Sequence, residues 1–165
     1  MGSPLQPHSP KVVERATVSV PKVIGATYYL VKLYAHDHEG IFGNVIDDHR
    51  FELSGIGQIA QDEWKRSAEA YTNLKLDKWV LWPNRLEGIV SLRDATGSGD
   101  YREHRSKPRL LTSFVASYKA AAAKRVNLLR NSPGSPLWQR GYQERFIADS
   151  IILKRVQQTL EQSRC

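Results

Sequence analysis

The chain has 165 residues, of which 41% are hydrophobic and 25% charged, as in a single soluble globular domain with a substantial core. Its one cysteine, Cys165, excludes a disulfide framework and a cysteine-based zinc site. No apolar run approaches the ~20 residues of a membrane helix and the start is not a secretory signal, so we expect a cytoplasmic protein with no membrane partner.

The net charge of +7 is concentrated in one part of the chain. Between Arg102 and Arg145 there are ten lysines and arginines and only two glutamates, so the rest of the chain is close to neutral. A concentrated basic segment predicts a polyanionic partner, most simply nucleic acid. A basic surface kept for solubility is the alternative.

The first part of the chain is predicted to be a flexible tail followed by strands. Residues 1–22 contain four prolines and are expected to be extended, so the folded domain should span 23–165. Residues 26–34 are rich in aromatic and β-branched side chains and predict a strand, which leads into a polar turn. Residues 41–46 and 50–53 predict two further short strands.

The middle of the chain predicts a helix and a strand pair. Ser54 is expected to cap a helix that runs to about residue 73. Residues 75–92 predict two strands with a break at Pro83-Asn84, and residues 95–108 predict a flexible loop. In the second strand, Arg85 and Glu87 should lie side by side on one face with Leu86 on the other, because strand side chains alternate. Taken alone, such a pair is a solvated salt bridge.

The last part of the chain predicts helix, strand and helix. Apolar residues at three-to-four spacing predict a helix from about 111 to 130, buried through Leu111, Val115, Tyr118, Ala122, Val126 and Leu129. Residues 137–146 predict a strand, and 149–162 a closing helix with Ile152, Val156 and Leu160 inward. This order implies an α+β sandwich, an antiparallel sheet with helices packed on a face.

Four motifs then occur in a fixed order. They are Gly-Ile-Gly-Gln-Ile-Ala at 55–60, Trp-Pro-Asn-Arg-Leu-Glu-Gly-Ile at 82–89, the helix and loop at 118–134, and Trp-Gln-Arg-Gly-Tyr-Gln-Glu-Arg-Phe-Ile at 138–147. Together they resemble small HUH-type tyrosine transposases of the REP-associated branch. The second motif is similar to that family's Pro-Asn-His-hydrophobe-His-Gly signature.

The resemblance implies a ferredoxin- or RRM-like sheet and a DNA partner, single-stranded or folded into hairpins. In that family two histidines bind Mg²⁺ or Mn²⁺, which polarises the scissile phosphate. A tyrosine on the last helix then attacks, giving a 5′-phosphotyrosyl intermediate. The family often dimerises, so a homodimer is a further expectation.

This chain departs from the family at every catalytic position. Arg85 and Glu87 occupy the two histidine positions, and an arginine cannot ligate a metal. Thr159 falls at the nucleophile position. We therefore expect a transposase-like DNA-binding protein that uses no metal cofactor and has lost its strand-transfer chemistry. The alternatives are a nicking enzyme with displaced catalytic groups and a remnant that does not bind DNA.

Candidate DNA contacts come from the basic segment, because arginine and lysine grip phosphates. They are Lys119, Lys124, Arg125, Arg130, Arg140 and Arg145, with Arg85 as a cation that could neutralise a phosphate in the former metal site. A solvated helix face is the alternative.

Three other features have a less specific pattern. His36-Asp37-His38, with His49 further on, could chelate a metal but is more typical of a polar turn. Tyr142 is interpreted as a packing or base-stacking residue rather than a displaced nucleophile. Trp138 is expected to pack in the core or at the domain edge, with a base-stacking platform as the alternative.

Overall fold

The computed structural model describes residues 25–36, 40–48, 50–93 and 108–163. Within them, a four-stranded antiparallel sheet has the order β4 (Leu74–Trp82), β5 (Arg85–Arg93), β1 (Ala26–Tyr34) and β6 (Gln143–Ile147). In sequence, helix α2 (Gly55–Glu69) lies between β1 and β4, and helix α4 (Arg109–Leu129) lies between β5 and β6. This is the ferredoxin-like split βαβ arrangement, which confirms the predicted α+β sandwich.

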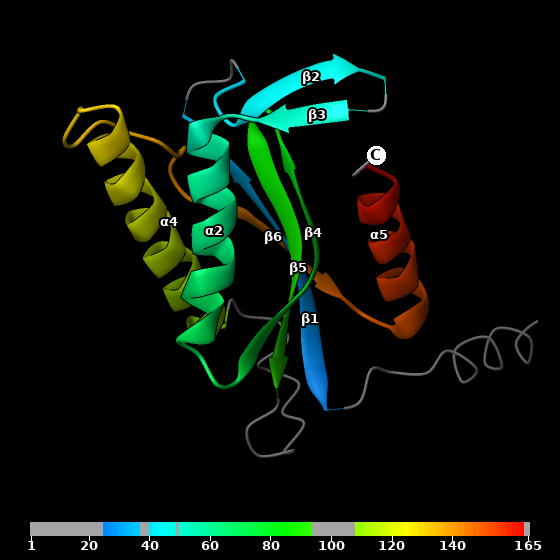
Figure 1. The fold of residues 1–165 in the computed structure, drawn as a ribbon. Coiled ribbons are helices and arrows are strands. Elements are labelled where there is room, and N and C mark those ends of the chain that lie inside the picture. Colours follow the sequence, from blue (N-terminus) through cyan, green and yellow to red (C-terminus); the bar gives the residue numbers. More distant parts are fainter. Residues whose placement is uncertain (1–24, 37–39, 49, 94–107, 164–165) are drawn as a thin grey trace, which may run out of the picture.

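The helices form a layer on each face of the sheet (Figure 1). Helices α2 and α4 lie side by side on one face, and α5 (Ser150–Ser163) lies alone on the other. A separate hairpin of β2 (Gly43–Asp47) and β3 (Arg50–Leu53) is inserted between β1 and α2. Residues 1–22, most of the expected loop at 95–108, and His38 and His49 lie outside the described residues.

The local signals before α2 start the helix where the sequence predicts it. The Ser54 hydroxyl accepts a hydrogen bond from the Gly57 N–H (2.9 Å) and donates one to the Ile41 carbonyl (2.8 Å). The helix ends at Glu69 rather than near residue 73, because a turn over residues 70–73 leads into β4 at Leu74. The Asn73 carbonyl accepts from the Arg93 N–H, and Leu74 is buried.

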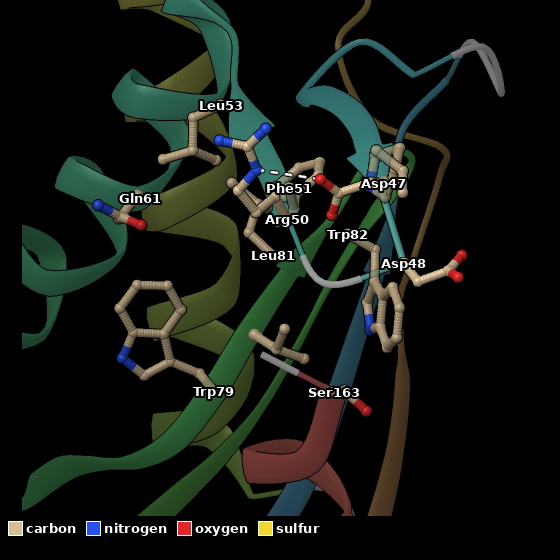
Figure 2. Close-up of a pocket in the computed structure, with 13 residues that line it drawn as sticks. Asp47, Asp48, Arg50, Phe51, Leu53, Gln61, Trp79, Leu81, Trp82 and Ser163 are labelled. Carbon is tan, nitrogen blue, oxygen red and sulfur yellow. Dashed lines mark hydrogen bonds and ion pairs between the residues drawn. The ribbon is translucent and has the colours of Figure 1, made fainter. Parts of the chain in front are cut away.

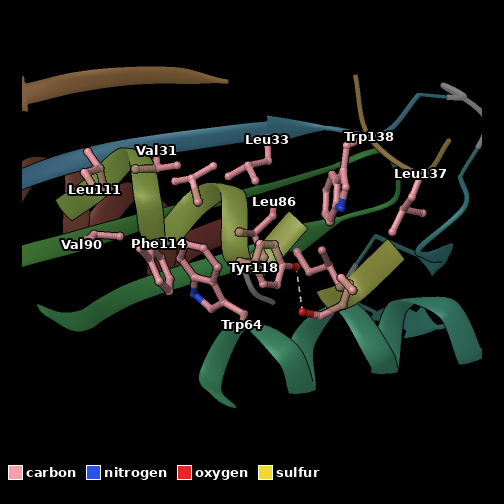
Figure 3. Close-up of a cluster of buried hydrophobic side chains, with 14 of the residues drawn as sticks. Val31, Leu33, Trp64, Leu86, Val90, Leu111, Phe114, Tyr118, Leu137 and Trp138 are labelled. Carbon is pink, nitrogen blue, oxygen red and sulfur yellow. Dashed lines mark hydrogen bonds between the residues drawn. The ribbon is translucent and has the colours of Figure 1, made fainter. Parts of the chain in front are cut away.

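The larger core lies between the sheet and the α2–α4 layer (Figure 3). Trp64 of α2 contacts two rings of α4, with centroid distances of 5.2 Å to Phe114 and 5.0 Å to Tyr118. The buried Tyr118 hydroxyl donates to the Ala60 carbonyl (2.8 Å), which links the two helices by a hydrogen bond as well as by packing. Trp138 is also buried against this cluster, as predicted.

Two expectations about the second half of the chain are wrong. Leu129 was expected to be inward but is 58% exposed, because it lies beside Gly55, the first residue of α2, which has no side chain to cover it. The strand expected over 137–146 is regular only from Gln143. Before it, Trp138 makes an isolated bridge to Ala35, and Gly141 has a left-handed backbone (φ 71°) that interrupts the ladder.

A smaller core lies between the sheet and α5. Leu30, Val80, Ile89 and Ile147 of the sheet contact Leu153 and Leu160, and Ile152 and Val156 pack beside them, so the predicted inward face of α5 is confirmed. Two polar contacts also hold α5 to β4: Lys78 Nζ lies 2.9 Å from Glu161 Oε1, and the Gln157 amide donates to Asp77. None of the helices in the described ranges is long and apolar enough to cross a membrane.

Candidate nucleic-acid interface

The sheet face that carries α5 has a polar end, and strand register determines which residues form it. Ile89 and Leu30 contact α5, and side chains on a strand alternate between faces. Arg85 and Glu87 therefore share the α5 face, and their Cα partners on β1, Tyr34 and Lys32, share it too. The same pairing adds residues from β4 and β6. We call this set the polar sheet face: Lys32, Tyr34, Trp82, Arg85, Glu87, Gln143 and Arg145.

Arg85 and Glu87 form an ion pair at the centre of this face, as their spacing predicts. Arg85 Nε donates to Glu87 Oε2 at 2.5 Å, and Arg85 Nη1 donates to Asn84 Oδ1 at 3.1 Å. The guanidinium also lies over the Trp82 ring, 4.7 Å from its centroid, a cation–π contact. The Arg85 side chain is 27% exposed and that of Glu87 14%, so the pair is accessible only from one side.

This arrangement does not fit a metal ion. Arginine has no lone pair to offer a metal, and here its guanidinium is hydrogen-bonded to the one carboxylate that could serve as a ligand. A cation at Glu87 would also be repelled by the adjacent positive charge. Across the described ranges, no cluster of three or more His, Cys, Asp or Glu side chains is placed to hold a metal.

Thr159, which the sequence resemblance predicts at the family's nucleophile position, lies on α5 near its C-terminal end. Thr159 is exposed, and its hydroxyl donates to the Arg155 carbonyl one turn earlier (2.9 Å). A threonine hydroxyl needs an adjacent base to become a nucleophile, and this hydroxyl is bound to a backbone acceptor instead. The neighbouring Leu160 faces the smaller core.

Tyr142 is held in a structural role, in agreement with its interpretation. It is half-buried against the larger core, and its hydroxyl donates to Glu144 Oε1 at 2.7 Å. Burial raises its pKa well above the usual 10, so the phenolate needed for attack is disfavoured. His36 is exposed at the end of β1, and the other two histidines of the proposed cluster lie outside the described residues.

Three of the predicted DNA contacts on α4 and at its C-cap make hydrogen bonds within the protein. Lys119 Nζ donates to the carbonyls of Gln139 and Gly141, both at 2.8 Å, and burial lowers its pKa. Arg130 donates to Asn127 Oδ1 and to the Pro136 carbonyl. These two side chains fix the chain that follows α4.

The third is Arg125, which joins α4 to α2. Its Nη1 lies 2.7 Å from both Asp62 Oδ2 and Glu63 Oε2. The hydrogen bond from Arg125 lowers the pKa of Asp62, and the same contact raises the pKa of Arg125. Since Glu63 is buried, this pair stabilises the packing of the two helices.

The other predicted cations are divided between the two sides of the molecule. Lys124, Arg140 and Arg145 are exposed and make no ion pair with the residues that the structure describes. Arg145 lies opposite Leu30 and so belongs to the polar sheet face. Arg140 lies at the same end of the sheet, because the Gln139 N–H donates to the Tyr34 carbonyl. Lys124 is on α4, on the opposite side.

Lys32, Tyr34 and Trp82 were not predicted as site residues. Tyr28, Leu30, Lys32 and Tyr34 alternate along β1, and this period of two places Lys32 and Tyr34 together on one face. What the sequence lacks is the register between β1 and β5, which brings Lys32 opposite Glu87. Trp82 could have been predicted as a neighbour of Arg85, because the two residues flank the Pro83-Asn84 turn and so pair across the two strands.

Comparisons with known proteins bear on the fold. A scan against known protein families finds none that matches this sequence. A Haemophilus influenzae protein, itself uncharacterized, is 21% identical over 131 residues, which cover 74% of this chain and 71% of that protein.

Among solved structures, a REP-associated tyrosine transposase bound to a REP hairpin superposes on this chain with a TM-score of 0.56 at 12% sequence identity. The match covers 84% of this chain and 66% of that transposase, just under two thirds of its length. At this identity the likeness establishes a shared fold. The chain therefore has a transposase-like fold.

Proposed function

We propose that this protein binds DNA that contains a hairpin with a single-stranded flank, through the polar sheet face, and does not cleave it by the phosphotyrosine route. The observation that carries this proposal is the Arg85–Glu87 ion pair, whose guanidinium lies over the Trp82 ring. By the sequence resemblance this pair stands at the family's two metal-ligand positions, so a fixed cation would take the place of a Lewis acid; the ion pair and the cation–π contact support that assignment.

Charge and aromatic side chains on this face support a nucleic-acid partner. Lys32, Arg85 and Arg145 outnumber the single acidic residue, Glu87, and Arg140 lies at the same end. Proteins that bind single strands combine cations that follow the phosphates with aromatic rings that stack on bases. Tyr34 and Trp82 are aromatic residues of this face.

The absence of a competent nucleophile among the candidates supports binding without cleavage. Thr159 donates to a backbone carbonyl, and the hydroxyl of the half-buried Tyr142 donates to a carboxylate. The hairpin to which the similar transposase is bound is a property of that protein, and it supplies the choice of DNA to test here.

The test incubates the full chain with a fluorescent hairpin that has a single-stranded flank, using a duplex and an unstructured strand of equal length as controls. We expect anisotropy to show tighter binding to the flanked hairpin, with a log–log salt slope of about −0.7 per phosphate contact. A denaturing gel of the same samples with Mg²⁺ or Mn²⁺ should show no covalent adduct and no nicked strand. An adduct would overturn the loss of chemistry, and equal weak binding to all three DNAs would overturn the recognition.

A further inference from the structure

A pocket of about 330 Å³ lies at the outer edge of β4, between the β2–β3 hairpin and the end of α5 (Figure 2). Trp79 and Trp82 lie on opposite sides of it, because residues three apart on a strand point to opposite faces. Phe51 of β3 and Ser163 at the end of α5 contribute to the other walls. Its volume is at the lower end of the roughly 300–1,000 Å³ typical of small-molecule sites.

The pocket is continuous with the polar sheet face through one residue. Trp82 lines the pocket and also carries the Arg85 guanidinium on its ring. If a phosphate of a DNA strand contacts Arg85, the adjacent nucleotide of that strand would therefore lie beside the pocket.

The polar groups of the lining suit the edge of a nucleobase. Gln61 offers an amide, which has both a donor and an acceptor, and Asp47 and Asp48 offer carboxylate acceptors. Arg50 neutralises part of that negative charge through its ion pair with Asp47 (3.1 Å). Glutamine amides pair with adenine, and carboxylates accept hydrogen bonds from exocyclic amino groups.

We propose that this pocket receives one unpaired nucleobase from the single-stranded flank of the bound DNA, favouring a base with an exocyclic amino group. The inference rests on the proposed function. An unpaired base fits better than an apolar protein side chain, because the walls combine aromatic rings with hydrogen-bonding groups and adjoin a cationic face.

The test replaces each nucleotide of the flank in turn by an abasic site and measures the affinity of the full chain. One position should lose about five- to 100-fold, the range that stacking of a single base on aromatic side chains gives. Thymine at that position should bind more weakly than adenine or cytosine. Neighbouring abasic positions should change affinity by less than about twofold, because their phosphates remain.

Two variants link the effect to the pocket. Trp79→Leu removes an aromatic wall, and Gln61→Leu removes the amide with little disturbance to the fold. Both should reduce the abasic penalty at the sensitive position, whereas Gln58→Leu, on the exposed face of the same helix, should leave it unchanged. The comparison is a double-mutant cycle between protein and DNA.

The possible failures are distinguishable. If the flanked hairpin binds tightly but no flank position is sensitive, or if Gln61→Leu and Trp79→Leu keep the full abasic penalty, the base pocket is overturned and the DNA-binding function stands. If the hairpin does not bind, both are overturned. In that case an increase in thermal stability with an apolar peptide, lost in Trp79→Leu, would assign the pocket to a protein partner.

Discussion

Arg125 provides a sharp test of how the basic residues of α4 are used, because its charge suggests DNA whereas its contacts are internal. Replacing it by methionine keeps an apolar, unbranched stem of similar length to the aliphatic part of arginine and removes the cation. The carboxylate of Glu63, whose side chain is 6% exposed, then loses a partner at 2.7 Å. Its other cationic partner, Arg66, is further away, at 3.5 Å.

The expected loss follows from these contacts. Removing one partner of a buried ion pair costs about 3–5 kcal/mol when the remaining charge is unpaired. Arg66 keeps part of the pairing, and the Arg125 side chain is 38% exposed, so water screens the interaction. We therefore expect Arg125→Met to lower the free energy of unfolding by about 2 kcal/mol, and the melting temperature by about 4–8 °C for a chain of this size.

Urea denaturation followed by circular dichroism measures this difference, and Lys124→Met is the matched control. Lys124 is the preceding residue, is exposed, and makes no ion pair with the described part of the chain. Its replacement should change stability by less than about 0.5 kcal/mol. If the two variants have equal stability, or if Arg125→Met loses less than the control, the structural role of Arg125 is refuted.

The ion pair between Arg125 and Asp62 predicts that the stability of the protein depends on pH. Arg125 holds the pKa of Asp62 below its usual 3.8, so this contribution is fully present above that value. It is lost as the pH falls through the lower pKa of the folded state. Below about pH 4 the wild-type protein should therefore lose more stability than Arg125→Met, which has no such contribution to lose. Equal acid sensitivity of the two proteins would contradict the assignment.

Three further predictions concern the core and the ion pair. Gly57→Ala should destabilise the protein by about 3 kcal/mol or more in urea denaturation, because a Cβ there would lie 2.0 Å from the Phe42 carbonyl oxygen; an unchanged midpoint would contradict this. Tyr118→Phe should cost about 1 kcal/mol in the same assay through loss of the bond to Ala60, and a neutral effect would refute it. Glu87→Gln should raise hairpin affinity and steepen its salt dependence in anisotropy titrations, because Arg85 is then free to neutralise a phosphate; weaker binding would argue against that role.

Most of the fold could be predicted from local patterns in the sequence. The limits of β1 follow from its aromatic and β-branched residues, and Ser54 and the Pro83-Asn84 turn mark the start of α2 and the β4–β5 connection. The misses have tertiary causes. Leu129 has the right spacing to be buried, but the residue it meets is Gly55, and nothing in the local pattern of α4 reveals that.

The candidate site was less accessible to sequence reasoning. Charge alone cannot distinguish a cation that binds a carboxylate on another helix from one that faces solvent. Arg125 and Arg145 were therefore predicted as DNA contacts on the same grounds, although of the two only Arg125 forms an ion pair with the residues that the structure describes. The Arg85–Glu87 pair was predictable, because it depends only on alternation within one strand. The Lys32–Glu87 juxtaposition and the pocket beside Trp82 depend on strand register and on the placement of the β2–β3 hairpin.

The most direct test of the central proposal compares the salt dependence of hairpin binding for wild type, Arg145→Ala and Lys124→Met. Both positions are exposed cations, but only Arg145 belongs to the polar sheet face. We predict that Arg145→Ala weakens binding and reduces the log–log slope by about 0.7, whereas Lys124→Met changes neither. A loss of slope in Lys124→Met, with none in Arg145→Ala, would place the DNA on the α4 side and contradict the proposal.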